Sequence, residues 1–428
     1  MPTAVHSARL RIGPVQATLL LLIALNLLNY IDRYILSGEL LPVQREFHAT
    51  DHQMGALATA LFVFYMLAAP ATGWLGDRMR RKPLIISGAV LWSLATLGTV
   101  WVHSYWTLYL RQAFVGIGEA TFGIFAPAVI ADFYPERERN RILSLFYVAI
   151  PVGAALGYLA GGQIGGQWGW RAPFFVCALP GFVAAALYGW LGREPERGAS
   201  DQIQSTLDRA TFRGLFHNRA YLAASFGLAT LTFAMGGISW WMPEFLRRFA
   251  GFSMGRASLA VGVITVIDGI AGTLVGGWLA QRWLRVNHRA LYLLSCWSVA
   301  LTLPFGLLVF FGPPAWTLPA LLAAEFFLFL NTGPLNAAIV NSVTAPIRAT
   351  AVGMNFFIIH CFGDTFSPQV IGAISDHAHS LRLAMGATLV ALAVSGVILF
   401  AGASVAPPLE EALESDAGDD SCSLIPVS

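Results

Sequence analysis

Charged residues are scarce in this chain of 428 residues. They make up 12% of it, whereas hydrophobic residues make up 56% and the mean hydropathy is +0.63. A soluble domain carries about 25% charged residues, so this chain has too few to cover a soluble surface of its size. We therefore expect the lipid bilayer to be the solvent for most of it. The net charge is only +2, and no basic run is long enough to follow a nucleic-acid backbone. Lys82 is the single lysine.

Cysteine pairs and catalytic motifs are also missing. The four cysteines form no C-x-x-C pair and have no histidine at metal-ligand spacing, so we expect neither a disulfide framework nor a metal site. The chain lacks a P-loop and an H-E-x-x-H motif. It is therefore predicted not to be an enzyme, to need no cofactor and not to be driven by ATP. No cleavage signal precedes the first apolar run, which is predicted to be a span rather than a signal peptide.

Long continuous apolar runs take the place of these features. A membrane-spanning helix needs about 20 mostly apolar residues, whereas a β-barrel alternates over about ten. The runs predict an all-α membrane protein with twelve transmembrane helices, near residues 16–40, 53–76, 83–103, 106–133, 142–165, 171–192, 218–241, 255–281, 289–312, 316–343, 348–374 and 381–405.

The basic residues indicate the orientation of these spans. If both termini face the cytoplasm, eighteen of the 26 basic residues lie on the cytoplasmic side, six lie on the other side, and Arg33 and Arg111 lie inside spans. Cytoplasmic loops are the ones enriched in Lys and Arg. We expect an integral multi-pass protein of the cell inner membrane, with both termini cytoplasmic.

The chain divides into two halves. We expect an N-terminal six-helix bundle over 1–192, a cytoplasmic linker over 193–217, a C-terminal six-helix bundle over 218–405 and a disordered acidic tail over 406–428. The halves are weakly repetitive, since GWLGDRMRRK after the second span has a counterpart in GGWLAQRWLR after the eighth. Two such pseudo-repeats are typical of secondary transporters with a site near the midplane.

Particular motifs resemble a known family. The segment GWLGDRMRRK at 73–82 resembles the loop signature of the major facilitator superfamily, although Arg80 stands where that signature has glycine. Within the superfamily, NYIDRYILSGEL at 29–40, RQAFVGIGEATFGIFAPAVIAD at 111–132 and RILSLFYVAIPVGAALGYLAGG at 141–162 resemble the Spinster family. The resemblance implies the two-bundle fold, a central cavity bordered by the first and fourth helices, and proton-linked export of lysophospholipids or sphingosine phosphate. It also implies gating by Asp77, Arg78 and Arg81.

Charged side chains inside spans are the candidates for the site, because each costs about 2.5–3.5 kcal/mol at a helix centre. Asn29 and Arg33 share one stripe of the first helix, and Asp32 lies about 100° around the helix from Arg33. We assign Arg33 to the cavity and Asp32 to a neighbouring helix. Glu119 is predicted to carry a proton with Asp32 as its partner; a permanent ion pair of Glu119 with Arg33 or Arg111 is the alternative.

Further polar residues complete the predicted site. Arg33, Arg111, Asn29, Asn331, Asn336 and His360 are the predicted substrate-binding residues. For His360 and the two second-half asparagines, a structural role is an equal alternative. Asp268, Glu325 and Asp364 also lie inside spans, and the sequence assigns them no role.

The sequence thus predicts a proton-coupled secondary transporter of an amphipathic anionic lipid, working by alternating access. Its partners would be a lipid or other small-molecule substrate, protons and membrane lipids, with no nucleic acid. The alternative is a proton-coupled transporter of small organic anions or drug-like compounds. A membrane scaffold or an intramembrane enzyme is a third possibility, against which the mid-membrane charges and the missing catalytic motifs argue.

Overall fold

The structure is a computed structural model that describes residues 13–134, 136–195, 214–343 and 347–407. Most of the predicted linker and nearly all of the predicted tail lie outside the described residues. Helices and short connections make up the described chain, and it contains no strand, which confirms the all-α prediction. Helices satisfy their own backbone hydrogen bonds, as a chain surrounded by lipid requires.

The first bundle contains the elements up to residue 191. Its helices are α1 (Pro14–Ile35), α2 (Leu40–Phe47), α3 (Asp51–Arg78), α4 (Arg81–Gly98), α5 (Tyr105–Phe133), α6 (Glu136–Tyr147), α7 (Ala149–Leu159), α8 (Gly166–Trp168) and α9 (Ala172–Leu191). The short segments η1 (Leu36–Glu39), η2 (Thr99–Trp101) and η3 (Ala160–Gly165) connect some of them. Hydroxyl side chains begin several helices: Thr50 and Gln53, for example, form reciprocal capping bonds of 3.2 and 2.9 Å at the start of α3.

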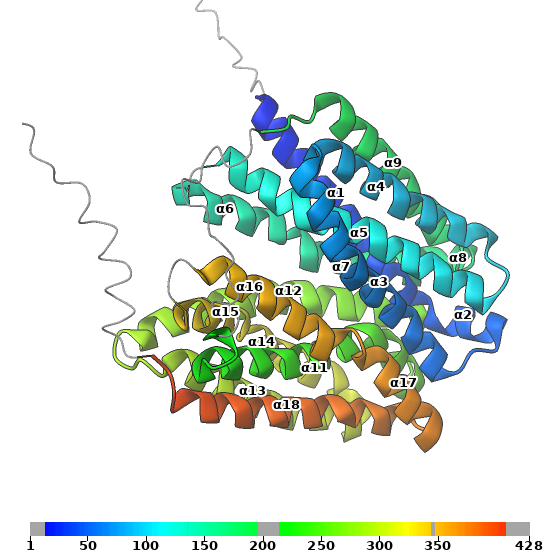
Figure 1. The fold of residues 1–428 in the computed structure, drawn as a ribbon. Coiled ribbons are helices and arrows are strands. Elements are labelled where there is room, and N and C mark those ends of the chain that lie inside the picture. The colour runs from blue at the N-terminus through cyan, green and yellow to red at the C-terminus, as the bar shows by residue number, and fades with distance from the viewer. Residues whose placement is uncertain (1–12, 135, 196–213, 344–346, 408–428) are drawn as a thin grey trace, which may run out of the picture.

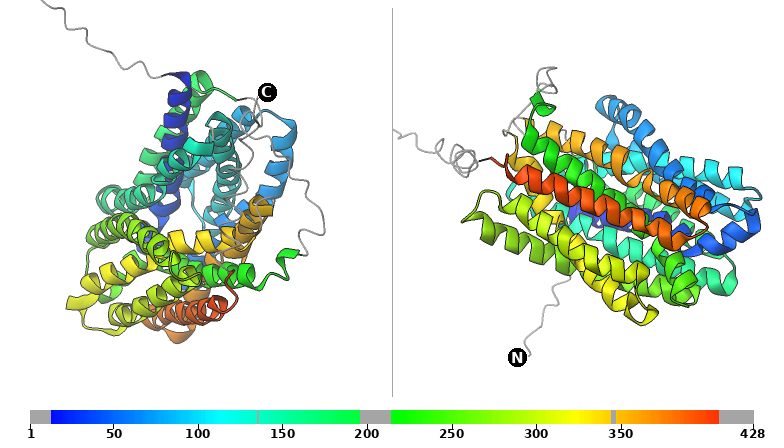
Figure 2. Two further views of the ribbon diagram at one scale, coloured as in Figure 1. Left: turned by 90° about the vertical axis from the view of Figure 1, so that its left-hand side faces the viewer. Right: turned by 90° about the horizontal axis from the view of Figure 1, so that it is seen from below.

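The second bundle begins at Arg219. It contains α11 (Arg219–Phe249), α12 (Met254–Leu284), α13 (Ala290–Phe311), α14 (Thr317–Phe329), α15 (Thr332–Asn341), α16 (Arg348–Ile359), α17 (Ser367–Ala378) and α18 (Leu381–Ala403), with η4 (Pro314–Trp316) and η6 (His360–Asp364) between helices. The left view of Figure 2 shows this bundle below the first one.

Eleven helices of the described residues are long and apolar enough to cross a membrane. The expected span at 348–374 is missing from the eleven because it is not one continuous helix. It consists of α16, the π-helical segment η6 and α17, and Gly363 within η6 has a non-helical backbone (φ −109°, ψ −109°). Non-helical backbone at membrane depth occurs where protein buries it or where it lines a cavity.

The two bundles meet at one end and diverge at the other. In Figure 1 the ribbons separate toward the end where α1 begins and α18 ends. We call the opposite end, which contains η1, α2, η3 and the end of α17, the distal end. There α3 packs against α17, and α7 and η3 pack against α12.

Hydrogen bonds join the bundles at the distal end. Arg248 at the end of α11 donates from two guanidinium nitrogens to the two carboxylate oxygens of Asp51, at 2.9 Å each. Asp376 accepts from the backbone N–H groups of Asp51 and His52 at 2.9 and 2.8 Å. These contacts hold the distal end closed.

Candidate substrate and proton site

An ion pair in the first bundle organises the candidate site. Arg33, at the end of α1, donates from Nε to Oε2 of Glu119 at 3.0 Å, and its Nη2 donates to the same oxygen. The Glu119 side chain is fully buried near the middle of α5, whereas 14% of the Arg33 side chain is exposed. The second oxygen of Glu119, Oε1, has no hydrogen-bond partner in the described structure, and Asn29 lies beside the carboxylate. The arginine is thus the accessible member of the pair.

Asp32 points away from this pair. Its Oδ2 accepts a hydrogen bond of 3.3 Å from Thr96 in α4, and its Oδ1 has no partner among the described residues. The residue is 3% exposed. Arg111 is the cation that acts most strongly on it. Glu119 is therefore paired with Arg33, whereas Asp32 has no ion-pair partner among the described residues and lies near Arg111.

Arg111 is buried and only partly satisfied. Its Nε donates to the Ala95 carbonyl at 3.3 Å and its Nη1 donates to Gln112, while Nη2 has no partner in the described chain. The guanidinium lies 4.8 Å from the centre of the Phe174 ring.

The broken span formed by α16, η6 and α17 brings a second polar pair to the same place. His360 and Asp364 lie one turn apart in η6, and His360 Nδ1 is 2.9 Å from Asp364 Oδ1. Their side chains are 25% and 20% exposed. The break in this helix therefore presents two polar side chains from the second bundle at the interface with the first.

Aromatic rings connect the two pairs. The Phe62 ring lies 5.3 Å from the Arg33 guanidinium and 5.9 Å from the His360 ring, which stacks on it. The Tyr30 ring lies 4.8 Å from Arg33, and the Tyr65 ring lies 6.4 Å from His360. We call this set the central cluster; it consists of Tyr30, Arg33, Phe62, Tyr65, Glu119, His360 and Asp364.

The aromatic members of the central cluster were not predicted from the sequence. Tyr30 lies three residues before Arg33, a spacing that places it on the same face of the helix and could have indicated it. Phe62 and Tyr65 carry no comparable signal, because the chain has 29 phenylalanines and 11 tyrosines.

The two predicted asparagines of the second bundle bond within that bundle. Asn331, buried between α14 and α15, donates from Nδ2 to Ser298 Oγ at 2.9 Å. Asn336 is exposed and bonds to the Thr332 carbonyl of its own helix at 2.7 Å. Neither contacts the central cluster through these bonds, and a substrate role for them stays a prediction.

The predicted gating residues lie at the opposite end from the closed interface. Arg81, the first residue of α4, pairs with Asp132 of α5 at 2.5 Å, and its backbone N–H donates to Glu194 at 2.5 Å. Arg78 is exposed, with its guanidinium 4.1 Å from the centre of the Trp74 ring. The Asp77 side chain lies outside the described residues.

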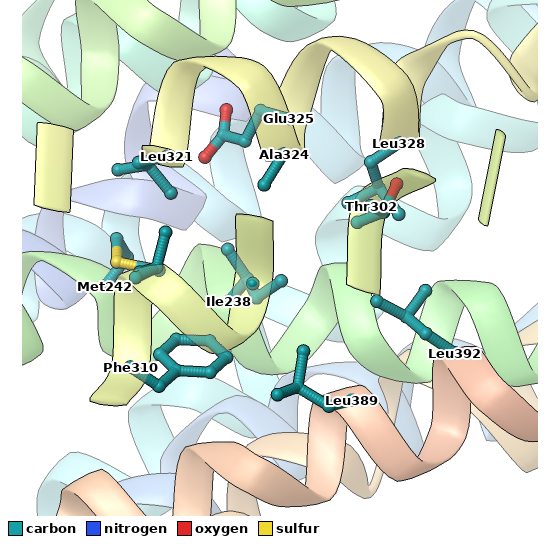
Figure 3. A pocket seen from close by; sticks show the side chains of 12 residues that line it. Ile238, Met242, Thr302, Phe310, Leu321, Ala324, Glu325, Leu328, Leu389 and Leu392 are labelled. Atoms are coloured by element: carbon teal, nitrogen blue, oxygen red, sulfur yellow. The ribbon is translucent and has the colours of Figure 1, made fainter. Parts of the chain in front are cut away.

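A small cavity in the second bundle is separate from the central cluster. It encloses about 20 Å³, and its walls are apolar except for Thr302 and Glu325 (Figure 3). That volume holds about one water molecule, so this cavity cannot hold a lipid.

The described residues contain no group of three His, Cys, Asp or Glu side chains that could hold a metal ion.

Comparison with known proteins identifies the class of this chain. The model of the Major Facilitator Superfamily matches residues 22–368, and the chain belongs to that superfamily of transporters. A crystal structure of a bacterial homolog of the human lysosomal transporter Spinster, in an inward-facing and unoccupied conformation, has a TM-score of 0.82 at 22% identity and covers 93% of this chain and 98% of that one. The crystal structure of a D-xylose–proton symporter has a TM-score of 0.71 at 16% identity, covering 90% and 97%. These likenesses show the fold.

The sequence relatives are more specific. Sphingosine-1-phosphate transporter SPNS2 of Xenopus tropicalis is 33% identical over 370 residues, covering 82% of this chain and 72% of that protein. Human protein spinster homolog 1 is 34% identical over 382 residues, covering 82% and 71%. The chain belongs to the Spinster family. It is a multi-pass membrane transporter, not an enzyme, and the resemblance drawn from its motifs is confirmed.

The bonds of Asn331 generate a stability prediction. Asn331→Ala removes the amide that joins α13 to the junction of α14 and α15, and interhelix hydrogen bonds in membranes contribute about 1 kcal/mol. Thermal unfolding in detergent should therefore occur at a lower temperature than in the unaltered protein. Asn336→Ala is the control and should leave unfolding unchanged. Normal stability of Asn331→Ala together with lost substrate binding would instead assign Asn331 to the substrate.

Proposed function

We propose that this protein transports an amphipathic anionic lipid, of the lysophospholipid or sphingosine-phosphate kind, coupled to protons. The observation that carries the proposal is the ion pair between Arg33 and Glu119, in which the acid is fully buried and the base is partly accessible. Such a pair couples a proton to an anion, because the ionised Glu119 carboxylate and the anion compete for the same arginine.

The proton is proposed to bind Glu119, with Asp32 as its partner. Protonation neutralises the carboxylate and releases the Arg33 guanidinium to an anionic headgroup. Deprotonation restores the ion pair and expels the anion. Removing one partner of a buried ion pair costs about 3–5 kcal/mol because the other charge is left uncompensated. Proton and anion binding are therefore linked, and one proton moving down 100 mV contributes about 2.3 kcal/mol.

The aromatic surroundings of Arg33 support a lipid over a compact solute. The rings of Tyr30 and Phe62 lie 4.8 and 5.3 Å from its guanidinium, and apolar rings of this kind can border an acyl chain. Two of the relatives are named sphingosine-1-phosphate transporter SPNS2. Asn29 beside Glu119 and Arg111 near Asp32 are proposed to complete the polar floor, with His360 facing them from the second bundle.

A small organic anion is the second candidate substrate. The polar pair His360 and Asp364 favours it, because a compact anion could interact with groups from both bundles at once. The central cluster would then enclose the substrate instead of binding a headgroup alone.

Orientation and gating belong to the same proposal. The excess of basic residues on one side supports cytoplasmic termini. The diverging end would then face inward, with the protein in the cell inner membrane. Asp77, Arg78 and Arg81 would then close the cytoplasmic end in the outward-facing state. The contacts of Arg81 with Asp132 and Glu194 support this by fixing the ends of α4 and α5 to each other.

Transport by purified protein in vesicles tests the proposal. A proton gradient is imposed, and movement of a lysophospholipid and of a small organic anion is followed together with the internal pH. We expect lysophospholipid movement accompanied by proton movement, and neither in vesicles containing Glu119→Gln. Protein-dependent movement of the organic anion alone would favour the second candidate, and lipid movement without any change in internal pH would contradict proton coupling.

The geometry of Arg33 predicts the effect of a conservative change. Its Nε and Nη2 both reach Glu119, and a planar guanidinium binds phosphate with two parallel bonds where an ammonium cannot. Arg33→Lys should keep the positive charge. It should nevertheless bind lysophospholipid about tenfold more weakly, because one charge-assisted hydrogen bond is lost. Titration of ligand binding to purified protein measures this, with exposed Arg282→Lys as the control. Equal affinity in Arg33→Lys and the unaltered protein would exclude a bidentate contact.

A further inference from the structure

Glu39 is a buried acid that neither the site nor the proposed mechanism uses. It ends η1 at the distal end of the first bundle and is 0% exposed. Both of its carboxylate oxygens lack a hydrogen-bond partner in the described structure. The carboxyl group rests directly on Gly165 of η3, where any larger residue would take its place.

The surroundings of Glu39 come from both bundles. The segment η1 packs against α7 and η3 of the first bundle and against α11 and α12 of the second. Ser37, two residues away, donates to the carbonyls of Ser239 and Trp240 at 3.1 and 2.7 Å. Gly38 lies so close to α7 and η3 that a Cβ there would be 3.0–3.2 Å from their backbone. Glu39 therefore lies in a segment that both bundles contact.

No described charge compensates Glu39. The titratable groups that its neighbouring elements carry at this end are Tyr34 of α1, Arg45 and Glu46 of α2, Tyr158 of α7, Glu244, Arg247 and Arg248 of α11, and Arg256 of α12, while η3 carries none. Several are bound elsewhere: Tyr158 donates to the Ser239 carbonyl, Glu46 pairs with Arg171, and Glu244 pairs with both Arg247 and Arg248.

We infer that Glu39 is a proton-binding site of the distal-closed state, separate from the Glu119 site. An ionised carboxylate that leaves water without a partner costs several kcal/mol, so the closed interface holds Glu39 in its neutral form. The inference rests on the alternating access proposed above, in which the distal end opens. That opening brings water to Glu39. An exposed glutamate ionises above about pH 4.3.

The sign of the pH effect follows from this difference. The closed state binds one proton more than the open state, so lowering the pH favours closure of the distal end and raising it favours opening. One proton changes the ratio of closed to open molecules by up to tenfold per pH unit. The effect needs no substrate, which separates it from the competition at Arg33.

Distance measurements across the distal end test the inference. Spin labels at exposed Arg45 and Ala378, in a protein whose native cysteines are replaced, report the separation of α2 and α17 in lipid nanodiscs without substrate. We expect the closed fraction to fall as the pH rises from about 5 to 8. Glu39→Gln is neutral at every pH, so it should stay closed. The change of up to tenfold per pH unit in the ratio of closed to open molecules should disappear in this variant. Glu46→Gln, which alters an exposed acid of the neighbouring helix α2, is the control and should keep the pH dependence.

Further outcomes separate the possible failures. Equal pH dependence in Glu39→Gln and the unaltered protein, with both opening, would overturn the Glu39 site and leave the proposed function intact. A distal end that never opens at any pH would contradict alternating access as well. Gly165→Ala gives an independent measurement, because its methyl group displaces the Glu39 carboxyl; it should favour the open state even at pH 5, and an unchanged closed fraction would count against the site.

Discussion

The buried ion pair between Arg33 and Glu119 is the interaction around which the central part of this transporter is arranged. Neither charge is stable alone in a low-dielectric interior, and removal of one partner leaves the other uncompensated. Glu119 is fully enclosed, so the partly exposed Arg33 is the only member that an anion can reach. This asymmetry allows protonation of the acid to release the base for an anion, and the aromatic rings around Arg33 provide an apolar border on the same side.

The fold places this pair where both bundles can act on it. The closed distal end, joined by Asp51 and Arg248, keeps the bundles together on one side of the central cluster, while they diverge on the other. The break in the span formed by α16, η6 and α17 lies at His360 and Asp364, and the His360 ring stacks on Phe62. The second bundle thus contributes polar groups to the central cluster. A movement that opens the distal end would change the surroundings of the cluster and of Glu39 together.

Much of this arrangement could be predicted from the sequence, for reasons that differ between residues. Lipid demands long apolar helices, so the spans are evident, and a charge such as Glu119 is conspicuous inside one. The direction of Asp32 relative to Arg33 follows from helical geometry. The break at Gly363 could not be predicted, because an apolar run has the same composition whether its helix is continuous or interrupted. Phe62 and Tyr65 could not be distinguished from packing or lipid-facing aromatics, and Asn331 offered no sign that its amide bonds to Ser298.

The central claim is that one removable proton on Glu119 controls access of the anion to Arg33. The most direct test is the affinity for a lysophospholipid, measured against pH, in the unaltered protein and in Glu119→Gln. The account predicts that affinity in the unaltered protein falls as the pH rises, because the deprotonated acid recaptures Arg33, and that Glu119→Gln binds with the higher affinity at every pH. Curves that bend at the same pH in both proteins would contradict it and would assign the coupling proton to another group, with His360 and Asp364 as the nearest candidates in the central cluster.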